Sequence, residues 1–333
     1  MKVGSSLSIA ELLRVSALLR VALRASDYGK RDHEPGEEDD ALDAMFRELA
    51  PVVSLAKEID RCILSEEEIA DDASNGLRSV RRAMKTAAEK IRTQLNSLVV
   101  NSRTYLQDGV ITMRNGRYCV PVKAEHKSNV PGMVHDQSSS GSTIFVEPLS
   151  VVKLNNELRE LEIREQKEIE AVLAALSNQT CDHLDELTLD LELIGELDFI
   201  FAKATLSRHY RGCEPRLNKD GIIRLKNARH PLLDPHRVVP ITLTLGENFD
   251  LLIVTGPNTG GKTVSLKTVG LFQLMGQAGL HIPAFQGSRL AVFSDIFADI
   301  GDEQSIEMNL STFSSHMTNL VHILDEADPN SLV

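Results

Sequence analysis

The sequence predicts a mixed protein in which an α-helical part with a small β insertion precedes an α/β domain. Three observations predict this fold class. Apolar residues recur at helical spacing before residue 100 and again from residue 149 to about residue 201. Between these stretches, residues 110–146 alternate with the period of two that is typical of strands. The apolar run Leu251–Val254 then leads directly into a glycine-rich segment, as a strand buried on both faces leads into a turn.

Chain length predicts more than one domain, because 333 residues exceed the roughly 250–300 over which a single core keeps growing. We place the boundaries where the periodicity changes. The predicted regions are a helical core at 1–104, a small β region at 105–147, long helices at 148–213 and the α/β domain at 214–333.

Composition restricts which partners the protein can bind and indicates the cellular compartment. The net charge of −12 means that a nucleic-acid site would have to be a local basic patch on an acidic surface. The four cysteines show no spacing typical of zinc sites, so we expect no zinc and a reduced, cytoplasmic setting. The apolar segment 7–23 superficially suggests a targeting peptide, but its arginines exclude a membrane span. Ser8 and Glu11 instead form a capping box that opens an amphipathic helix, and we expect no membrane contact.

The first region reads as helices over residues 8–25, 41–49, 52–64 and 77–99, the last capped at Ser74. The acidic run Glu37–Asp40 is typical of a solvated linker. The last helix is rich in basic residues, which either face phosphates or form a solvated face, the commoner arrangement. They are Arg78, Arg81, Arg82, Lys85, Lys90 and Arg92.

The β region contains a tight hairpin at Asn115-Gly116, a pair that supplies the positive φ angles such a turn requires. The hydroxyl-rich loop Gln137–Thr143 either bonds phosphate oxygens or is a plain loop, and both interpretations stay open. A helix is predicted to begin at Pro148. Its leucines and those of a second run, broken from the first near Asn178, predict an antiparallel pair of long helices with coiled-coil-like contact. The first would span about 45 Å at roughly 1.5 Å per residue.

The glycine-rich segment in the α/β domain fits the pattern G-x-x-x-x-G-K-[ST] at every fixed position, between a predicted strand and a predicted helix. Glycines let several backbone N–H groups point at phosphate oxygens, and the helix adds its positive end. We therefore predict a P-loop that binds ATP with Mg²⁺, in which Lys262 meets the β and γ phosphates and Thr263 holds the metal. The predicted binding residues are Gly256, Pro257, Asn258, Thr259, Gly260, Gly261, Lys262, Thr263 and Val264.

Hydrolysis also needs a carboxylate pair, normally at the end of a second buried strand. Asp325-Glu326 is rejected for this role, because the apolar residues before it recur at helical spacing and place it at the end of a helix. A further strand begins only at Ser331–Val333.

Several segments together resemble the ATPase of the MutS family. They are Thr255–Val264, Gly279–Ala284, Gly301–Ser305 and Leu310–Phe313, in that order and spacing. Upstream, Tyr105–Asp108, Arg114–Tyr118, Pro121–Glu125, His135–Ser138, Leu154–Leu161 and Ala228–Leu233 resemble the second bacterial branch, which lacks the mismatch-reading and connector domains. The resemblance covers nearly the whole chain. It implies a P-loop ATPase domain of ABC type, preceded by a helical core and lever domain with a small β clamp insertion.

The resemblance also implies function. Members of the family dimerise with two ATP sites at the interface, where Ser311 and Thr312 would act in trans on the partner's nucleotide. The clamp embraces DNA, and this branch resembles suppressors of recombination that engage branched or junction DNA. Such proteins carry a C-terminal Smr nuclease domain and are connected to collided ribosomes, so ribosomal RNA is a second expected partner.

The chain departs from the family pattern at its ends. Compared with the family, the carboxylate pair, the helical dimerisation element and the nuclease domain are missing after Val333, and part of the core is missing before Met1. We therefore expect an engineered fragment that binds ATP, hydrolyses it poorly and is monomeric.

Two other functions remain as hypotheses. The chain could act as a non-catalytic nucleic-acid-binding architectural module with an inactive nucleotide loop. It could instead be a motor of the ABC or SMC type, which the lack of an LSGGQ-like signature and the short helical pair disfavour. The position of the adenine pocket, including any role of His230, is not fixed by the sequence.

Overall fold

The computed structural model describes residues 6–30, 40–257, 261–300 and 309–333, and the side chains of the same residues except 309–315. Contacts within the chain divide it into two compact units, Met1–Gly195 and Glu196–Val333. This division falls inside a helix, whereas the sequence places domain changes at 105, 148 and 214, and those boundaries stay predictions.

The first unit opens with helices α1 (Ile9–Gly29), α2 (Ala41–Glu48) and α3 (Val53–Cys62), followed by the short hairpin β1 (Ile63–Ser65) and β2 (Glu68–Ile69). The predicted capping box is confirmed: Glu11 N–H donates to Ser8 Oγ, and Ser8 N–H donates to the Glu11 carboxylate. One buried cluster joins α1 and α3 to helix α5 (Leu149–Asp182), with Leu12, Ile59 and Leu176 almost fully buried.

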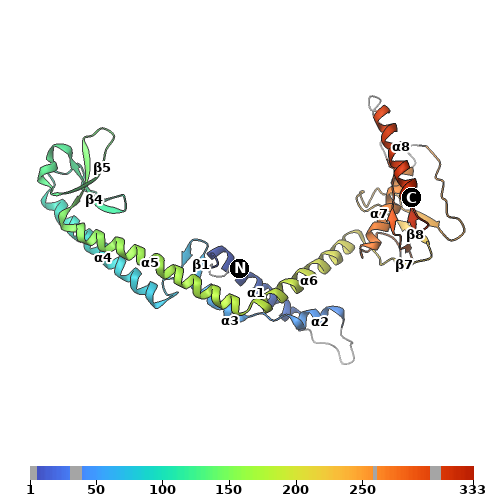
Figure 1. The fold of residues 1–333 in the computed structure, drawn as a ribbon, viewed down its shortest axis with the longest axis horizontal. Helices are drawn as coiled ribbons and strands as arrows, with labels where there is room; N and C mark the ends of the chain where they lie inside the picture. Colours follow the sequence, from blue (N-terminus) through green and yellow to red (C-terminus); the bar gives the residue numbers. More distant parts are fainter. Residues whose placement is uncertain (1–5, 31–39, 258–260, 301–308) are drawn as a thin grey trace. The chain divides into compact units, whose positions relative to one another are not determined.

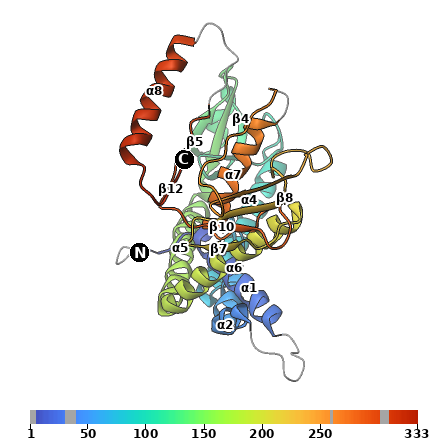
Figure 2. The same cartoon turned by 90° about the vertical axis from the view of Figure 1, so that its right-hand side faces the viewer.

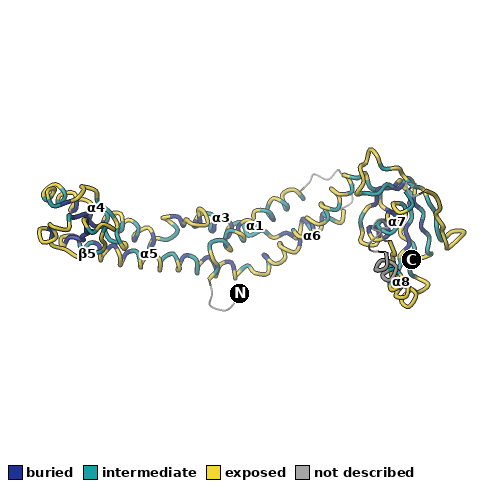
Figure 3. The backbone as a smooth tube through the Cα atoms, turned by 90° about the horizontal axis from the view of Figure 1, so that it is seen from above, coloured by how far each residue is buried: buried dark blue, intermediate teal, exposed yellow. Residues whose placement is uncertain are grey.

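Two long helices form the centre of the unit, α4 (Asn75–Asn101) and α5 (Leu149–Asp182). They lie side by side, and their buried positions alternate with exposed ones along each helix (Figures 1 and 3). Ser74 caps α4 as predicted, since its Oγ accepts from Leu77 N–H. Pro148 immediately precedes α5, also as predicted.

The predicted antiparallel pairing of the two long helical runs is wrong. Helix α5 continues past Asn178 to Asp182, the break comes at His183, and α6 (Leu184–Tyr210) follows. Helix α5 packs against α4 and, farther along, against α1 and α3. The physical reason is that an apolar face of a helix can be buried against any other apolar face within reach, and α4 has such a face. The buried side chains of this contact are Val80, Ala87, Ile91 and Leu95 of α4 with Val151, Leu158 and Leu161 of α5.

The β region is a four-stranded sheet in the order β3-β4-β6-β5. Its strands are β3 (Thr112–Arg114), β4 (Arg117–Lys123), β5 (Gly132–Gln137) and β6 (Thr143–Pro148), with a 3-10 turn at Ala124–Asn129. The hairpin at Asn115-Gly116 is confirmed, with φ angles of 50° and 74° and Arg114 opposite Arg117. The apolar face of the sheet joins the same core as α4 and α5.

The basic side chains of α4 are partly neutralised. Arg81 contacts Glu165 and Asp71 at 2.7 Å each, Lys85 contacts Asp71 at 3.2 Å, and Arg78 lies 3.5 Å from Asp72. These pairs favour a solvated face with internal ion pairs over a helix that meets phosphates, at least for the N-terminal half of α4. The loop Gln137–Thr143 is likewise bonded within itself, with Thr143 N–H donating to Ser138 Oγ at 3.1 Å.

The second unit contains a four-stranded sheet in the order β7-β10-β8-β9. The strands are β7 (Arg216–Asn218), β8 (Ile223–Ala228), β9 (Ile241–Leu245) and β10 (Arg289–Ala291), and helix α7 (Lys262–Gln277) packs on β10. Phe272 of α7 is fully buried in a core with Leu225 and Leu290. A second strand pair, β11 (Asp295–Ile296) and β12 (Ser331–Leu332), is parallel, and helix α8 (Asn309–Glu326) turns back into β12 (Figure 2).

The prediction of a buried strand at Leu251–Val254 is wrong for this structure. The segment forms no strand, and Leu251 and Ile253 are each 75% exposed. A strand inside a sheet needs hydrogen-bonded neighbours, and no strand among the described residues pairs with this one. An apolar run predicts burial only where such neighbours are present.

None of the helices in the described ranges is long and apolar enough to cross a membrane.

The contact between α4 and α5 predicts the cost of a core substitution. Ile91→Ala should lower the free energy of unfolding of the first unit by about 2–5 kcal/mol, because Ile91 is fully buried and the substitution leaves a cavity. The exposed Val100→Ala on the same helix should change it by only about 0.5 kcal/mol. Urea unfolding followed by circular dichroism measures both, and equal effects would contradict the assigned interface.

Candidate functional site

The start of α7 has the geometry of an anion-binding site. Gly261 is the N-cap residue, with φ of 79° and ψ of 14°, and none of the side chains that the structure describes caps the first turn. Gly256 has φ of 146°, so both glycines adopt backbone angles that other residues rarely take. The first N–H groups of a helix have no partner within it, and the helix end carries partial positive charge. The backbone here therefore offers donors to an anion.

Lys262 is the first residue of α7, and its ammonium group donates a hydrogen bond to the carbonyl oxygen of Gly256. The lysine thus spans the loop from its end to its beginning. The ammonium group is therefore held beside the first residue of the glycine-rich segment.

The other predicted loop residues are placed in part. Pro257 is exposed, as are Thr263 and Val264 in the first turn of α7. Asn258, Thr259 and Gly260 lie outside the described residues. No cluster of His, Cys, Asp or Glu side chains suitable for a metal ion occurs in the part of the chain that the structure describes.

Helix α7 is fixed to the sheet by two glutamines that the sequence analysis did not single out. The fully buried Gln273 donates to the carbonyl of Ala291. The Gln277 amide bonds both backbone groups of Phe293, at 2.9 Å and 3.0 Å, as a neighbouring strand would. Gly276 packs so closely on Leu290 that a Cβ atom would collide with it. These contacts fix where the first turn of α7 lies.

A polar cluster joins the chain after β11 to helix α8. His316 Nδ1 lies 2.7 Å and 2.8 Å from the two carboxylate oxygens of Asp299, and Asn319 Nδ2 donates to the same carboxylate at 3.1 Å. These hydrogen bonds, first that from Asn319 and then that from His316, lower the pKa of Asp299. Ser311 and Thr312 lie in the first turn of α8, and their side chains are outside the described part. The cluster thus holds the helix that carries them.

Two acids and a histidine of the second unit lie outside the glycine loop. Asp325 and Glu326 are exposed at the end of α8, as predicted, and not at the tip of a strand. His230 lies near Lys267 of α7, and burial together with that lysine lowers its pKa. The position beside α7 does not by itself assign His230 a ligand.

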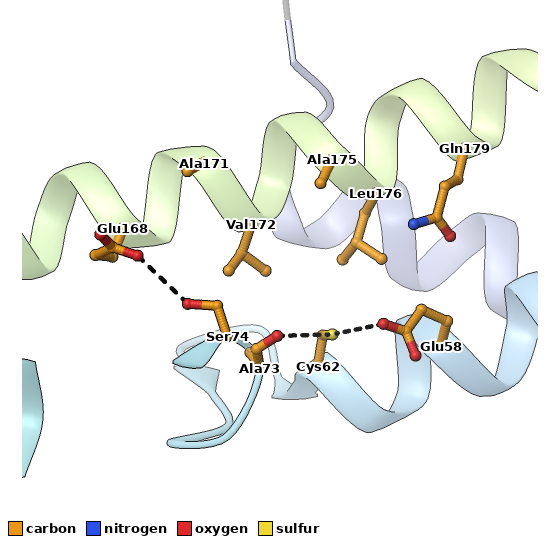
Figure 4. A pocket seen from close by; sticks show the side chains of 10 residues that line it. All are labelled: Glu58, Cys62, Ala73, Ser74, Glu168, Ala171, Val172, Ala175, Leu176 and Gln179. Atoms are coloured by element: carbon orange, nitrogen blue, oxygen red, sulfur yellow. Dashed lines mark hydrogen bonds between the residues drawn. The ribbon is translucent and has the colours of Figure 1, made fainter. Parts of the chain in front are cut away.

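The first unit holds a separate cavity of about 170 Å³ between α3, the start of α4 and α5 (Figure 4). The thiol of Cys62 lies 3.7 Å from the Glu58 carboxylate and 3.9 Å from the Ala73 carbonyl oxygen. Burial and the neighbouring Glu58 raise the pKa of the thiol. Since the thiolate is the reactive form of a cysteine, the raised pKa disfavours reaction of this thiol near neutral pH.

Comparison with known proteins identifies the class. A family model described as MutS domain V matches residues 252–333, the part that contains the glycine loop, α7 and α8. The chain belongs to the MutS family.

The branch follows from relatives that match along the whole chain. The chain is 59% identical over 332 residues to "Endonuclease MutS2" of Agathobacter rectalis, and the matched region covers 99% of this chain and 42% of that protein. It is 56% identical over 339 residues to the protein of the same name from Lachnoclostridium phytofermentans, covering 100% and 43%. It is also 48% identical over 334 residues to that of Alkaliphilus metalliredigens, covering 100% and 42%. Within the MutS family the chain therefore falls in the MutS2 branch, and it spans less than half the length of these relatives.

The Asp299 cluster predicts a pH effect on α8. A carboxyl group whose pKa is lowered in the folded protein stabilises the fold above its ordinary value of 3.8 and loses that effect as the pH falls through the lowered value. In Asp299→Asn the amides of α8 should therefore be less protected from hydrogen exchange than in the wild type at about pH 5. The difference should shrink below pH 3.8.

The matched control is Asp325→Asn, at the exposed end of the same helix, which should leave the protection of α8 nearly unchanged. Equal protection of α8 in the wild type and in Asp299→Asn at about pH 5 would show that the cluster does not hold the helix.

Proposed function

We propose that the chain is the ATP-binding, DNA-engaging part of a MutS-type clamp ATPase. The observation that supports ATP binding best is the uncapped start of α7, with two glycines in unusual backbone angles and Lys262 across the loop. Residues 256–264 would surround the phosphates, Lys262 would neutralise the β and γ groups, and Thr263 would hold Mg²⁺. Bound Mg²⁺ would neutralise charge on the transferred phosphoryl group.

Hydrolysis requires groups beyond the loop. We propose that Ser311 and Thr312, in the first turn of α8, act in trans on the nucleotide of a second subunit. On this proposal, turnover depends on dimerisation, and an isolated monomer binds ATP but hydrolyses it slowly.

The nucleic-acid partner is proposed from the family. The relatives are named "Endonuclease MutS2", and the resemblance to the MutS family implies DNA as the partner. We propose branched DNA as the substrate, with suppression of recombination as the outcome and nuclease action in the longer protein. Collided ribosomes are a second proposed target. The four-stranded sheet beside α5 is the proposed DNA-engaging region.

A second candidate is an architectural module in which the nucleotide loop is inactive. The exposed, unpaired run Leu251–Val254 favours it, because in this structure the segment before the loop lacks a supporting sheet. Nucleotide binding separates the two candidates.

Removing the lysine tests the ATP site. Lys262→Ala should weaken MgATP binding by at least about tenfold, equivalent to about 1.4 kcal/mol, because the charged contact to the phosphates is lost. Isothermal titration of the chain measures it, with Lys219→Ala, an exposed lysine of the same unit, as the control. Equal affinity of the wild type and Lys262→Ala would exclude the ATP site and leave the architectural module.

A salt series tests DNA engagement. Binding of a four-way junction should weaken steeply as the salt concentration rises, because phosphate contacts release counterions. Affinity for the junction should exceed that for duplex DNA of equal length, and MgATP should change it. Fluorescence anisotropy measures these affinities. Equal binding of junction and duplex would contradict the proposed preference, and no binding to either would contradict DNA engagement by this chain.

A further inference from the structure

A buried carboxylate joins the β sheet to helix α5. Glu147, the penultimate residue of β6, has no exposed surface. Its Oε1 accepts from Arg117 Nη1 at 2.7 Å and from Asn155 Nδ2 at 2.8 Å, and its Oε2 lies 2.6 Å from His135 Nε2. We call Glu147, Arg117, His135 and Asn155 the Glu147 network. It connects strands β4, β5 and β6 with helix α5.

Asn155 extends the network to the backbone of β4. Its side-chain amide donates to the carbonyl oxygen of Tyr118 and accepts from the N–H of Tyr118, both at 3.2 Å. The amide group thus takes the place of a neighbouring strand. A second contact from the same strand to α5 runs from Arg117 Nη2 to Asn156 Oδ1, at 2.7 Å.

Apolar side chains make further contacts between the sheet and the helices. Val120, Val146 and Val151 are almost fully buried in the shared core. Apolar burial stabilises the contact but has no preferred direction, so it limits rotation of the sheet weakly. The chain passes from β6 into α5 at Pro148 without a loop, and Leu149 N–H donates to the Pro131 carbonyl oxygen at 3.1 Å, which ties the start of α5 to the segment before β5. Hydrogen bonds have preferred angles, and bonds to charged groups are the stronger ones.

The electrostatic balance agrees with this geometry. Burial alone would raise the pKa of Glu147, but the hydrogen bonds from Asn155, His135 and Arg117 outweigh it and lower the pKa. The carboxylate is therefore charged near neutral pH, and each partner meets a full negative charge. A buried charge of this kind is costly when one of its partners is removed.

We propose that Glu147 is a positioning residue: its network fixes the orientation of the β sheet on helix α5, so that the sheet and the helix act as one body. The part of the proposal that concerns DNA rests on the proposed function, in which this sheet engages DNA. Without the charge of Glu147, the apolar core would keep the sheet attached but would allow it to turn.

Hydrogen exchange tests the orientation directly. In Glu147→Gln, the amide of Tyr118, which bonds Asn155, should exchange about tenfold faster at about pH 7, whereas ladder amides of strands β4 and β6 should keep their wild-type rates. Asp136→Asn is the matched control, because Asp136 is an acid of the same sheet that is 47% exposed and paired with Arg114. It should leave Tyr118 unchanged.

Two results would overturn the proposal. One is an unchanged rate at Tyr118 in Glu147→Gln. The other is an equal acceleration of all ladder amides, which would mean that Glu147 only stabilises the fold. If Glu147→Gln does not fold, His135→Gln tests the same network from a partially exposed position, with the same pattern expected at smaller size.

A parallel DNA measurement separates this proposal from the proposed function. If the sheet engages DNA, Glu147→Gln should also bind a four-way junction about tenfold more weakly, and Asp136→Asn much less so. A faster Tyr118 amide with unchanged DNA affinity would support the positioning role and count against DNA engagement by this sheet. An unchanged Tyr118 amide would overturn the positioning role whatever the DNA result.

Discussion

The close packing of helix α7 on strand β10 is the constraint on which the candidate nucleotide site depends. Gly276 packs so closely on Leu290 that an added Cβ atom would collide with its side chain, Gln273 bonds the last residue of β10, and Gln277 bonds the backbone just after it. The helix therefore starts at a defined place. Its first amides, left uncapped at Gly261, and the side chain of Lys262 face the loop as a consequence. The chemistry proposed for the loop follows from how the far half of the helix is packed.

The first unit combines two kinds of contact with different roles. Apolar stripes on α4 and α5 hold the long helices together and supply most of the burial. Polar side chains around Glu147 orient the sheet on α5 where the two meet. The segments that carried the resemblance to the MutS family in this region include Arg117, His135 and Asn155, which the fold brings together around Glu147. Residues from three of these segments therefore meet where the sheet contacts α5.

Local features were predictable from the sequence, and long-range pairings were not. The capping box at Ser8, the cap at Ser74, the turn at Asn115-Gly116 and the helical position of Asp325 depend on residues close together in the chain. The pairing of α5 with α4 was missed because the leucine spacing predicts that one face of a helix is buried, but does not predict which other helix covers that face. The exposed state of Leu251–Val254 was missed for the same reason. Glu147 and Asp299 were missed because single acidic residues carry no periodic signal, and their partners lie up to 30 residues away in the chain.

The nucleotide site requires the backbone at the start of α7 to close around a triphosphate. A crystal structure of the chain grown with Mg²⁺ and a non-hydrolysable ATP analogue would show whether it does. We expect the β and γ phosphates against the amides of residues 261–263, with the Lys262 ammonium moved from the Gly256 carbonyl to the phosphates. A nucleotide bound elsewhere, with Lys262 still bonded to Gly256 in an unobstructed loop, would contradict it.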